Sequence, residues 1–254
     1  MKILLTNDDG IFAPGLAVLY RRLSTIAEVF VAAPANVQSG AGHSISLSEI
    51  TCEYLDIIGK FKGFSVDGSP ADCVKLAINE LFASEGPFDL VVSGMNNGAN
   101  VGINVFYSGT VAGAIEAAFY NLPAIAVSAA MDEPMKMDEA ADYAIDVIRQ
   151  LTDLPAGRVA NLNIPQLSKG KPKGLLVVPQ STHGFDEQYI SRTDDNGQSI
   201  YQLTGGTHRD PRDGNWTDTM ALQAGYITLT CLRQELTDPA GNELLKQKAL
   251  KFKA

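Results

Sequence analysis

Two adjacent carboxylates, Asp8 and Asp9, come directly after a short apolar run over residues 3–6. At a strand end the backbone turns, so both side chains can converge on one hard cation that offsets their mutual repulsion. The same Asn-Asp-Asp-Gly sequence also favours a solvated turn, which stays open as the alternative. The pair is therefore a candidate metal site, and its role depends on the loops that surround it.

Three later loops carry polar groups of complementary kinds. Residues 34–44 are rich in hydroxyl, amide and backbone donors and suit a loop that faces a ligand. Residues 93–102 contain three asparagines and three glycines, which supply neutral oxygen ligands and permit close backbone approach. Residues 107–110 open a helix, where hydroxyls and backbone N–H groups form an anion site. The alternative is that Ser108 or Thr110 only caps the helix.

None of these four loops contains a lysine or an arginine. A phosphate bound there must be neutralised by another group. A divalent ion held by the two carboxylates would bridge to phosphoryl oxygens and polarise phosphorus for attack by water. Oxygen ligands from Asp, Asn and Ser favour Mg²⁺ or Mn²⁺ over zinc. Phosphoester hydrolysis is the leading reaction class.

The residues leave several roles in that reaction open. One of the two carboxylates could act as a general base, and an aspartyl-phosphate intermediate is an alternative to direct attack by water. His43, His183 and His208 are candidates for protonating the leaving group, and the sequence favours none of them. A histidine in a loop such as 34–44 is more often structural than catalytic.

Short apolar runs alternate with segments of helical spacing along most of the chain. Strands are predicted at 3–6, 29–33, 44–48, 88–92, 124–128, 159–162 and 175–178, and helices from 14, at 70–82, at 110–120 and at 138–151. This alternation predicts an α/β fold with right-handed crossovers and a mostly parallel sheet covered on both faces. Ligands bind at the carboxyl ends of such strands, so we expect the four polar loops to gather at one edge.

From about residue 180 the sequence becomes polar and rich in Gly and Asp. A strand-like alternation returns at 225–230, and a Lys-rich helix is predicted near the end. The chain shows no internal repeat and no low-complexity linker. We therefore predict a single domain over residues 1–254, with a core at about 1–180 and an extension at about 181–254 that packs on the core or on a partner subunit.

The 254 residues are 45% hydrophobic and 19% charged, which is typical of a globular domain and not of a disordered chain. The net charge of −9 disfavours binding to nucleic acid, which depends on basic side chains. Cys52, Cys73 and Cys231 form no C-x-x-C pattern, so neither a disulfide framework nor a zinc knuckle is predicted. Asp8 and Asp9 come before an apolar leader segment could form, and no stretch approaches ~20 apolar residues. We therefore expect a cytoplasmic protein that does not enter a membrane.

Six segments carry a specific combination of motifs, in order over roughly residues 3–165. They are ILLTNDDG, APANVQSGAGHSIS, DGSPADCVKLA, SGMNNGANVG, YSGTVAGAIEA and NLNIP. Together they resemble the SurE (survival protein E) family of metal-dependent 5′/3′-nucleotidases. The resemblance implies a Rossmann-like three-layer core and one divalent ion, Mg²⁺ or Mn²⁺, per subunit. The implied metal ligands are Asp8, Asp9, Ser39 and Asn96, and the implied phosphate contacts are Asn96, Ser108, Gly109 and Thr110.

The resemblance also implies an activity and an assembly. The expected reaction is release of phosphate from nucleoside 5′- and 3′-monophosphates by attack of an activated water, with Asp8 and Asp9 at the reaction centre. The expected assembly is a homodimer or homotetramer built partly by exchange of C-terminal segments. Residues 179–185 and 205–218 depart from the commoner family pattern, which leaves the base preference and the subunit contacts open, although Asp218 lies where the family's Thr-Asp segment would.

Two other classes of protein share part of the pattern. A receiver-like phosphoacceptor module has an acidic pair after its first strand, but it needs a further Asp after its third strand and a Lys after its fifth. The strands predicted here end in Asn/Gly loops and in Ser-Ala-Ala. A dinucleotide-binding oxidoreductase needs G-x-G-x-x-G where this chain has Asn-Asp-Asp-Gly. Hydrolysis is therefore preferred, with the receiver-like signalling module as the alternative.

Overall fold

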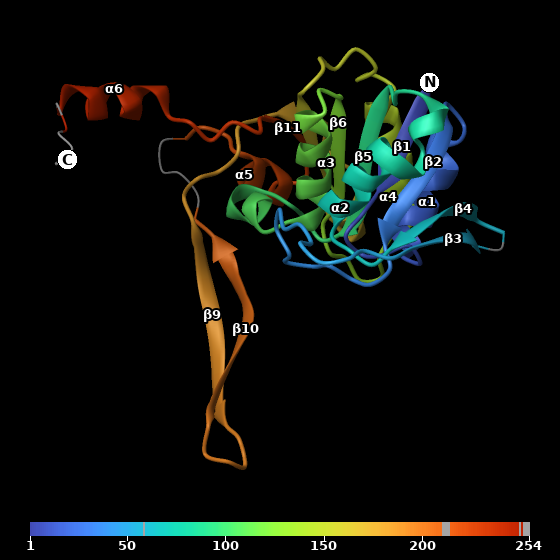
Figure 1. Cartoon of the computed structure of the whole chain (residues 1–254). Helices are drawn as coiled ribbons and strands as arrows, with labels where there is room; N and C mark the ends of the chain where they lie inside the picture. The colour runs from blue at the N-terminus through green and yellow to red at the C-terminus, as the bar shows by residue number, and fades with distance from the viewer. Residues whose placement is uncertain (58, 210–213, 249, 251–254) are drawn as a thin grey trace.

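The computed structural model describes residues 1–57, 59–209, 214–248 and 250. Within these residues, nine strands form one sheet and two further strands form a separate hairpin. The strands of the sheet are β1 (Lys2–Thr6), β2 (Glu28–Pro34), β3 (Cys52–Ile57), β4 (Phe61–Val66), β5 (Leu90–Asn97), β6 (Ala124–Ala129), β7 (Val159–Ile164), β8 (Leu175–Val177) and β11 (Ile227–Leu232). They lie in the order β3-β4-β2-β1-β5-β6-β7-β11-β8 (Figure 1).

The centre of this sheet is parallel. β1 lies between β2 and β5, and the parallel pairing continues through β6 to β7 on one side and to β4 on the other. At the edges, β3 is antiparallel to β4, and β11 is antiparallel to β7 with β8 beside it. The prediction of a mostly parallel sheet is confirmed. Because Thr6, the last residue of β1, pairs with Ser93, β5 continues beyond the end of β1 to Asn97.

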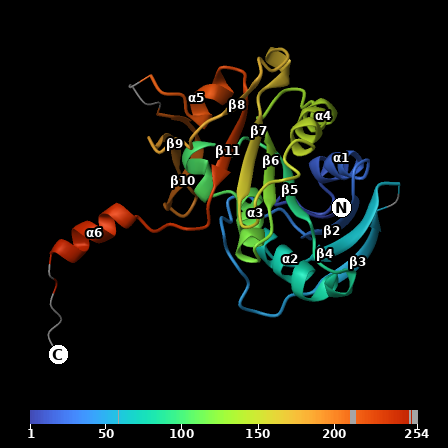
Figure 2. The ribbon, with the colours of Figure 1, turned by 90° about the horizontal axis from the view of Figure 1, so that it is seen from above.

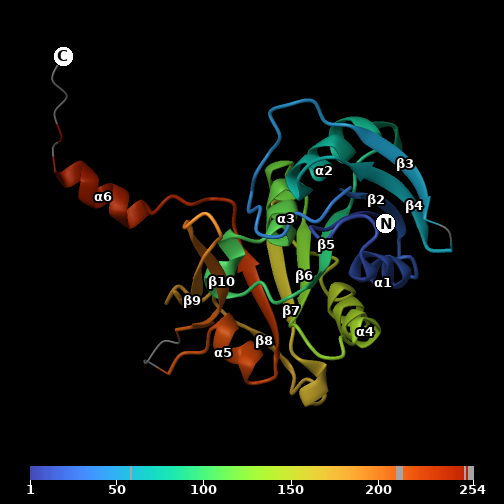
Figure 3. The same cartoon turned by 90° about the horizontal axis from the view of Figure 1, so that it is seen from below.

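Helices cover both faces of the sheet (Figures 2 and 3). The longer helices described are α1 (Pro14–Leu23), α2 (Pro70–Leu76), α3 (Gly109–Phe119), α4 (Met137–Ile148), α5 (Asp218–Gln223) and α6 (Pro239–Gln247), with shorter turns at Ala77–Leu81, Ala83–Glu85, Gly102–Phe106 and Leu167–Lys169. Side chains alternate along a strand, so Ile3 and Leu5 enter the core with α1 and α4, whereas Leu4 enters the core with α2 and α3. The expected α/β sandwich of three layers is confirmed.

Side-chain caps begin the two helices nearest the candidate site. Ser69 Oγ accepts a hydrogen bond from the N–H of Asp72 (3.1 Å), and the Asp72 carboxylate accepts one from the N–H of Ser69 (2.9 Å). This capping box starts α2. Ser108 Oγ accepts from the N–H of Val111 (3.1 Å) at the start of α3. A Cβ on Gly113 would lie 3.0 Å from Ser93 Oγ, so the small residues of α3 allow it to pack closely against the sheet.

One predicted strand is wrong, and so are the predicted bounds of another. Residues 44–48 form no strand, because the N–H and hydroxyl of Ser46 bind the carboxylate of Asp72 (3.1 and 2.8 Å) instead of a neighbouring strand. β5 begins later than predicted and continues to Asn97, so residues 93–97 belong to the strand and not to a loop. Polar residues end the apolar run at Ser93, and hydrophobic periodicity therefore ends the strand too early.

The segment after residue 180 both joins the sheet and projects from it (Figure 1). β11 inserts between β7 and β8, so the extension completes the core. β9 (Phe185–Thr193) and β10 (Ser199–His208) pair as a long antiparallel hairpin that the polar sequence did not predict. α6 stands away from the body, and none of its residues is buried. Among the described helices, none has the length and apolar character that crossing a membrane requires.

Candidate active site at the carboxyl edge of the sheet

Asp9 and Asn96 lie where the ends of β1 and β5 meet. The Asp9 carboxylate accepts a hydrogen bond from the backbone N–H of Asn97 (3.3 Å), which joins the two strand ends. The side-chain amide of Asn96 donates to the carbonyl of Gly98 (2.8 Å) and so supports the turn that leaves β5. The structure therefore brings Asp9 to the segment that carries Asn96. The role of Asn97 was not predicted, because a backbone N–H leaves no signal in the residue types.

Asp8 is the buried member of the acidic pair, with 3% of its surface exposed. Thr110 Oγ1 donates a hydrogen bond to Asp8 Oδ1. Gly109 packs on the same side chain, where an added Cβ would lie 2.8 Å from Asp8 Cβ. Burial raises the pKa of Asp8 above its usual 3.8 and the charge of Asp9 adds to the rise, whereas the hydrogen bonds from Thr110 oppose it. The structure thus brings Asp8, Gly109 and Thr110 together.

Ser108 is buried and stands at the cap of α3. Its hydroxyl accepts a hydrogen bond from Val111, so the capping role that the sequence left open is present. A hydroxyl that accepts one bond can still donate its own proton, and the cap is therefore compatible with a contact to phosphate. The positive end of the α3 dipole lies in this first turn, where it favours bound negative charge.

Ser39 lies on an exposed loop that reaches over the same edge of the sheet. Its neighbour Gln38 donates a backbone hydrogen bond to the carbonyl of Asp8 (2.7 Å). Gly42 donates another to the carbonyl of Tyr107 (3.0 Å), the residue before Ser108. Ser39 is therefore held between the acidic pair and the start of α3. The structure records no side-chain contact that joins Ser39 to Asp8 or Asp9, and its role as a ligand stays a prediction.

The negative charges of Asp8 and Asp9 suit a bound metal cation as their partner, since no cationic side chain pairs with them in the described residues. Within the part of the chain that the structure describes, no Lys, Arg or His forms an ion pair with Asp8 or Asp9. The same residues contain no cluster of three or more His, Cys, Asp or Glu side chains arranged to hold a metal. Any metal at this edge would need neutral oxygen ligands beside the two carboxylates, as hard divalent cations accept.

A buried network of amides supports the loop that follows β5. Asn163 Oδ1 accepts from the N–H of Asn100 (2.8 Å), and the side chains of Asn161 and Asn163 donate to the carbonyl of Asn100 (2.7 and 3.2 Å). The Asn100 side chain donates to Ser128 Oγ on β6 (2.9 Å). The two asparagines of β7 are visible in the sequence as Asn-Leu-Asn, but no role was predicted for them.

The sheet is mostly parallel, and an acidic pair whose first member, Asp8, is buried lies at its carboxyl edge beside the N-terminus of a helix. This arrangement is typical of the class of α/β proteins that hold anionic ligands at strand ends. The family model described as "Survival protein SurE" matches residues 3–187. The chain belongs to the SurE family.

Individual relatives match along nearly the whole chain. The 5′-nucleotidase SurE of Rhodopirellula baltica is 43% identical over 240 residues, which cover 93% of this chain and 94% of that protein. The 5′-nucleotidase SurE 1 of Thermus thermophilus is 39% identical over 243 residues, 93% of each chain. The crystal structure of the SurE protein from Aquifex aeolicus matches with a TM-score of 0.83 and 32% identity, and covers 98% of this chain and 100% of that one.

Proposed function

We propose that this protein is a metal-dependent phosphomonoesterase that hydrolyses nucleoside 5′- and 3′-monophosphates to nucleoside and phosphate. The observation that carries the proposal is the burial of Asp8 beside Asp9, against the first turn of α3, with no described cation to pair with it. The names of the relatives as 5′-nucleotidases support the same activity.

The residues of the site suit one divalent ion per subunit, Mg²⁺ or Mn²⁺. Asp8 and Asp9 would hold it together with Ser39 and Asn96, and Asp8 in particular gains a partner for a charge that burial disfavours. When bound, such an ion supplies Lewis acidity at a phosphoryl oxygen and lowers the pKa of water. The oxygen donors of these four side chains are the type that Mg²⁺ and Mn²⁺ prefer.

The remaining chemistry falls to the start of α3. The hydroxyls of Ser108 and Thr110 and the backbone of Gly109 would hold the phosphoryl oxygens, with Asn96 nearby. Water attacks phosphorus in line, one new P–O bond forms, and the P–O bond to the ribose oxygen breaks as that oxygen takes a proton. A carboxylate of the acidic pair accepts the proton that the water loses.

We also propose a homodimer or homotetramer that acts in the cytoplasm without nucleic acid or membrane as a partner. The projecting hairpin and α6 support self-association, because both expose large apolar side chains: Tyr189, Ile190, Tyr201 and Leu203 on the hairpin, and Leu244 and Leu245 on α6. Cys52, Cys73 and Cys231 are all free thiols, as suits a reducing compartment.

Phosphate release from a panel of 5′- and 3′-nucleoside monophosphates tests this function. We expect release with Mn²⁺ or Mg²⁺, none in EDTA, and a loss of more than about 100-fold in Asp9→Ala, since it removes a charged ligand and not merely its support. The control is Asp153→Ala, an exposed aspartate before β7 that should keep full activity. Wild-type turnover in Asp9→Ala with Mn²⁺ would refute the assigned ligand. If the protein binds metal but releases phosphate from none of the nucleotides, the proposed hydrolase activity is refuted.

A further inference from the structure

The loop over residues 38–46, called the strap below, connects three parts of the candidate site. At the start of the strap, the N–H of Gln38 donates to the carbonyl of Asp8 (2.7 Å). Further along, the N–H of Gly42 donates to the carbonyl of Tyr107 (3.0 Å). Ser39 lies between these two contacts. Gly40 and Gly42 have φ values of +74° and +58°, which favour glycine. The backbone of the strap therefore turns sharply just after Ser39.

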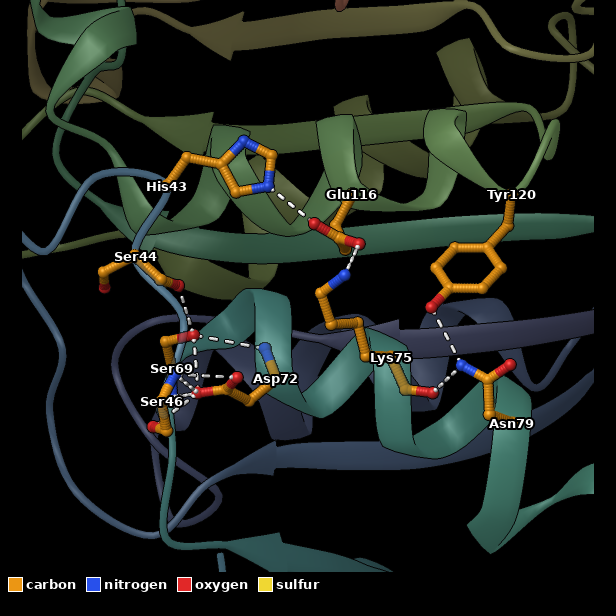
Figure 4. A network of polar contacts seen from close by, with 9 residues as sticks. All are labelled: His43, Ser44, Ser46, Ser69, Asp72, Lys75, Asn79, Glu116 and Tyr120. Atoms are coloured by element: carbon orange, nitrogen blue, oxygen red, sulfur yellow. Dashed lines mark hydrogen bonds and ion pairs between the residues drawn. The ribbon is translucent and has the colours of Figure 1, made fainter. Parts of the chain in front are cut away.

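A buried carboxylate on α3 holds the strap just beyond Gly42 (Figure 4). Glu116 Oε2 lies 2.7 Å from His43 Nε2, and Glu116 Oε1 lies 2.7 Å from Lys75 Nζ on α2. Only 4% of the Glu116 side chain is exposed, against 31% for His43. Burial by itself raises the pKa of Glu116, but the hydrogen bonds from His43 and Lys75 outweigh it and leave the pKa below its usual 4.5. Glu116 is thus ionised and engaged on both oxygens.

The next residues of the strap are fixed to α2 by a second carboxylate. Ser69 Oγ donates to the carbonyl of Ser44 (2.7 Å), and Asp72 accepts from both the N–H and the hydroxyl of Ser46 (3.1 and 2.8 Å). Figure 4 shows that these contacts and the His43 contact follow one another along the strap. The strap is therefore fastened at 38, 42, 43, 44 and 46, and its end near Asp72 would stay in place if the His43 contact were lost.

The position of Glu116 on α3 gives the His43 contact a specific consequence. Thr110 and Glu116 belong to the same helix, six residues or about 9 Å apart along its axis. His43 therefore ties the strap to the rigid element whose first turn contacts Asp8. Its Nε2 is engaged by Glu116, and its ring lies 5.8 Å from that of Phe119. Both contacts suit a histidine that fixes a loop and not one that donates a proton to a leaving group.

We propose that Glu116 is a positioning residue: through His43 it holds the strap against α3, and so places Ser39 between the acidic pair and the phosphate-binding turn. Lys75 forms an ion pair with the other carboxylate oxygen, Oε1, so its loss should leave the His43–Glu116 contact in place. The inference rests on the proposed function, because it assigns the positioning to the same metal and phosphate site.

Three variants separate positioning from simple stabilisation. We expect His43→Ala to raise the KM for nucleotide and the apparent Kd for Mn²⁺ by about 10-fold or more, as loss of a supporting contact does, with a smaller change in kcat. His43→Gln keeps an N–H donor for Glu116 and should restore both constants to within about threefold of the wild type. Lys75→Ala should lower the Tm but leave both constants unchanged. Equal increases in Lys75→Ala and His43→Ala, or no increase in His43→Ala, would overturn the proposal.

Hydrogen exchange of the enzyme without nucleotide gives an independent readout. The amides of residues 39–43, including the N–H of Gly42, should exchange faster in His43→Ala than in Lys75→Ala, because only the first variant frees the strap. Equal exchange in the two variants would refute the positioning role whether or not the wild type releases phosphate. A silent wild type whose strap loosens only in His43→Ala would refute the proposed hydrolysis and support the His43–Glu116 anchor.

Discussion

At the scale of single residues, Asp8 lies in surroundings that disfavour its charged form. It is buried beside Gly109 and Thr110, and no described residue supplies a cation to it. An ionised carboxyl in such surroundings destabilises the folded state unless hydrogen bonds or a bound cation compensate for lost hydration. Glu116 shows the contrast, because hydrogen bonds from His43 and Lys75 lower its pKa in a site of similar burial. The difference between the two carboxyls agrees with the ligand-binding role that we propose for Asp8.

The raised pKa of Asp8 makes a prediction about stability. The folded state binds this proton more tightly than the unfolded chain, so the contribution to stability is fully present below pH 3.8 and is lost as the pH rises through the folded pKa. Asp8→Asn keeps an oxygen acceptor for Thr110 and removes the charge. We expect it to increase the free energy of unfolding by about 0.5–2 kcal/mol at pH 7 in EDTA, measured by urea denaturation.

The gain in Asp8→Asn should shrink as the pH falls toward 3.8, where the wild-type carboxyl is also neutral. Added Mn²⁺ should stabilise the wild type more than the variant, since ligand binding to the folded state adds to its stability. Asp153→Asn, at an exposed position, is the control and should change neither quantity. A less stable Asp8→Asn at pH 7 would mean that the bonds from Thr110 outweigh burial, contrary to our interpretation.

At the scale of elements, strand β7 supports a loop that it does not carry. Its Asn161 and Asn163 are fully buried and bind the backbone of Asn100, two strands away in the sheet order. The side chains of Asn161 and Asn163 both donate to the carbonyl of Asn100. The N–H of Asn100, by contrast, donates to Asn163 Oδ1. The two asparagines are alike in burial and differ in what their loss would leave unpaired.

This asymmetry predicts different costs for the same substitution. Asn163→Ala leaves the buried N–H of Asn100 without its acceptor and should lower the free energy of unfolding by about 2–3 kcal/mol. Asn161→Ala removes one of two donors to the Asn100 carbonyl and should cost about 1 kcal/mol. Chemical denaturation of both variants measures the difference. Equal losses would show that the cavities, and not the hydrogen bonds, determine the cost.

Elements with strong periodicity could be predicted from the sequence, and the others could not. β1, β2, β6 and the helices that follow them were predicted to within a few residues, because apolar runs mark these elements. The hairpin of β3 and β4 and that of β9 and β10 were missed. β3 and β10 are largely exposed and show little of the alternation that a core imposes. β4 is largely buried, but Lys62, Gly63 and Ser65 interrupt its apolar run. Tertiary pairing, and not local pattern, defines these strands.

For the candidate site, the motifs located every loop but few of the contacts between them. Asp8, Gly109 and Thr110 do meet, as strand order and helix position led us to expect. The Asp9 contact with Asn97 and the His43 contact with Glu116 depend on loop conformation, which the order of residues does not reveal. Backbone donors and long-range ion pairs carry no sequence spacing of their own.

For the whole molecule, the parts that project cannot be stable by their own contacts. An isolated two-stranded hairpin is at best marginally stable in water, and so is a helix as short as α6. Both project from the body in Figure 1 and expose apolar side chains, among them Tyr201, Leu244 and Leu245. In the proposed homo-oligomer, a second copy of the chain would supply matching surfaces in a closed, symmetric assembly.

The proposed homo-oligomer predicts that substitutions on α6 weaken subunit association. Burying a leucine side chain contributes about 1.5–3 kcal/mol, so Leu244→Ser and Leu245→Ser should each weaken subunit association by roughly 10- to 100-fold. The double variant should therefore sediment as a smaller species at micromolar concentration in analytical ultracentrifugation. Lys246→Ser, which changes an exposed polar residue of the same helix, should leave the wild-type mass unaltered. If the double variant keeps that mass, α6 lies outside the interface, and the hairpin alone must then hold the subunits together.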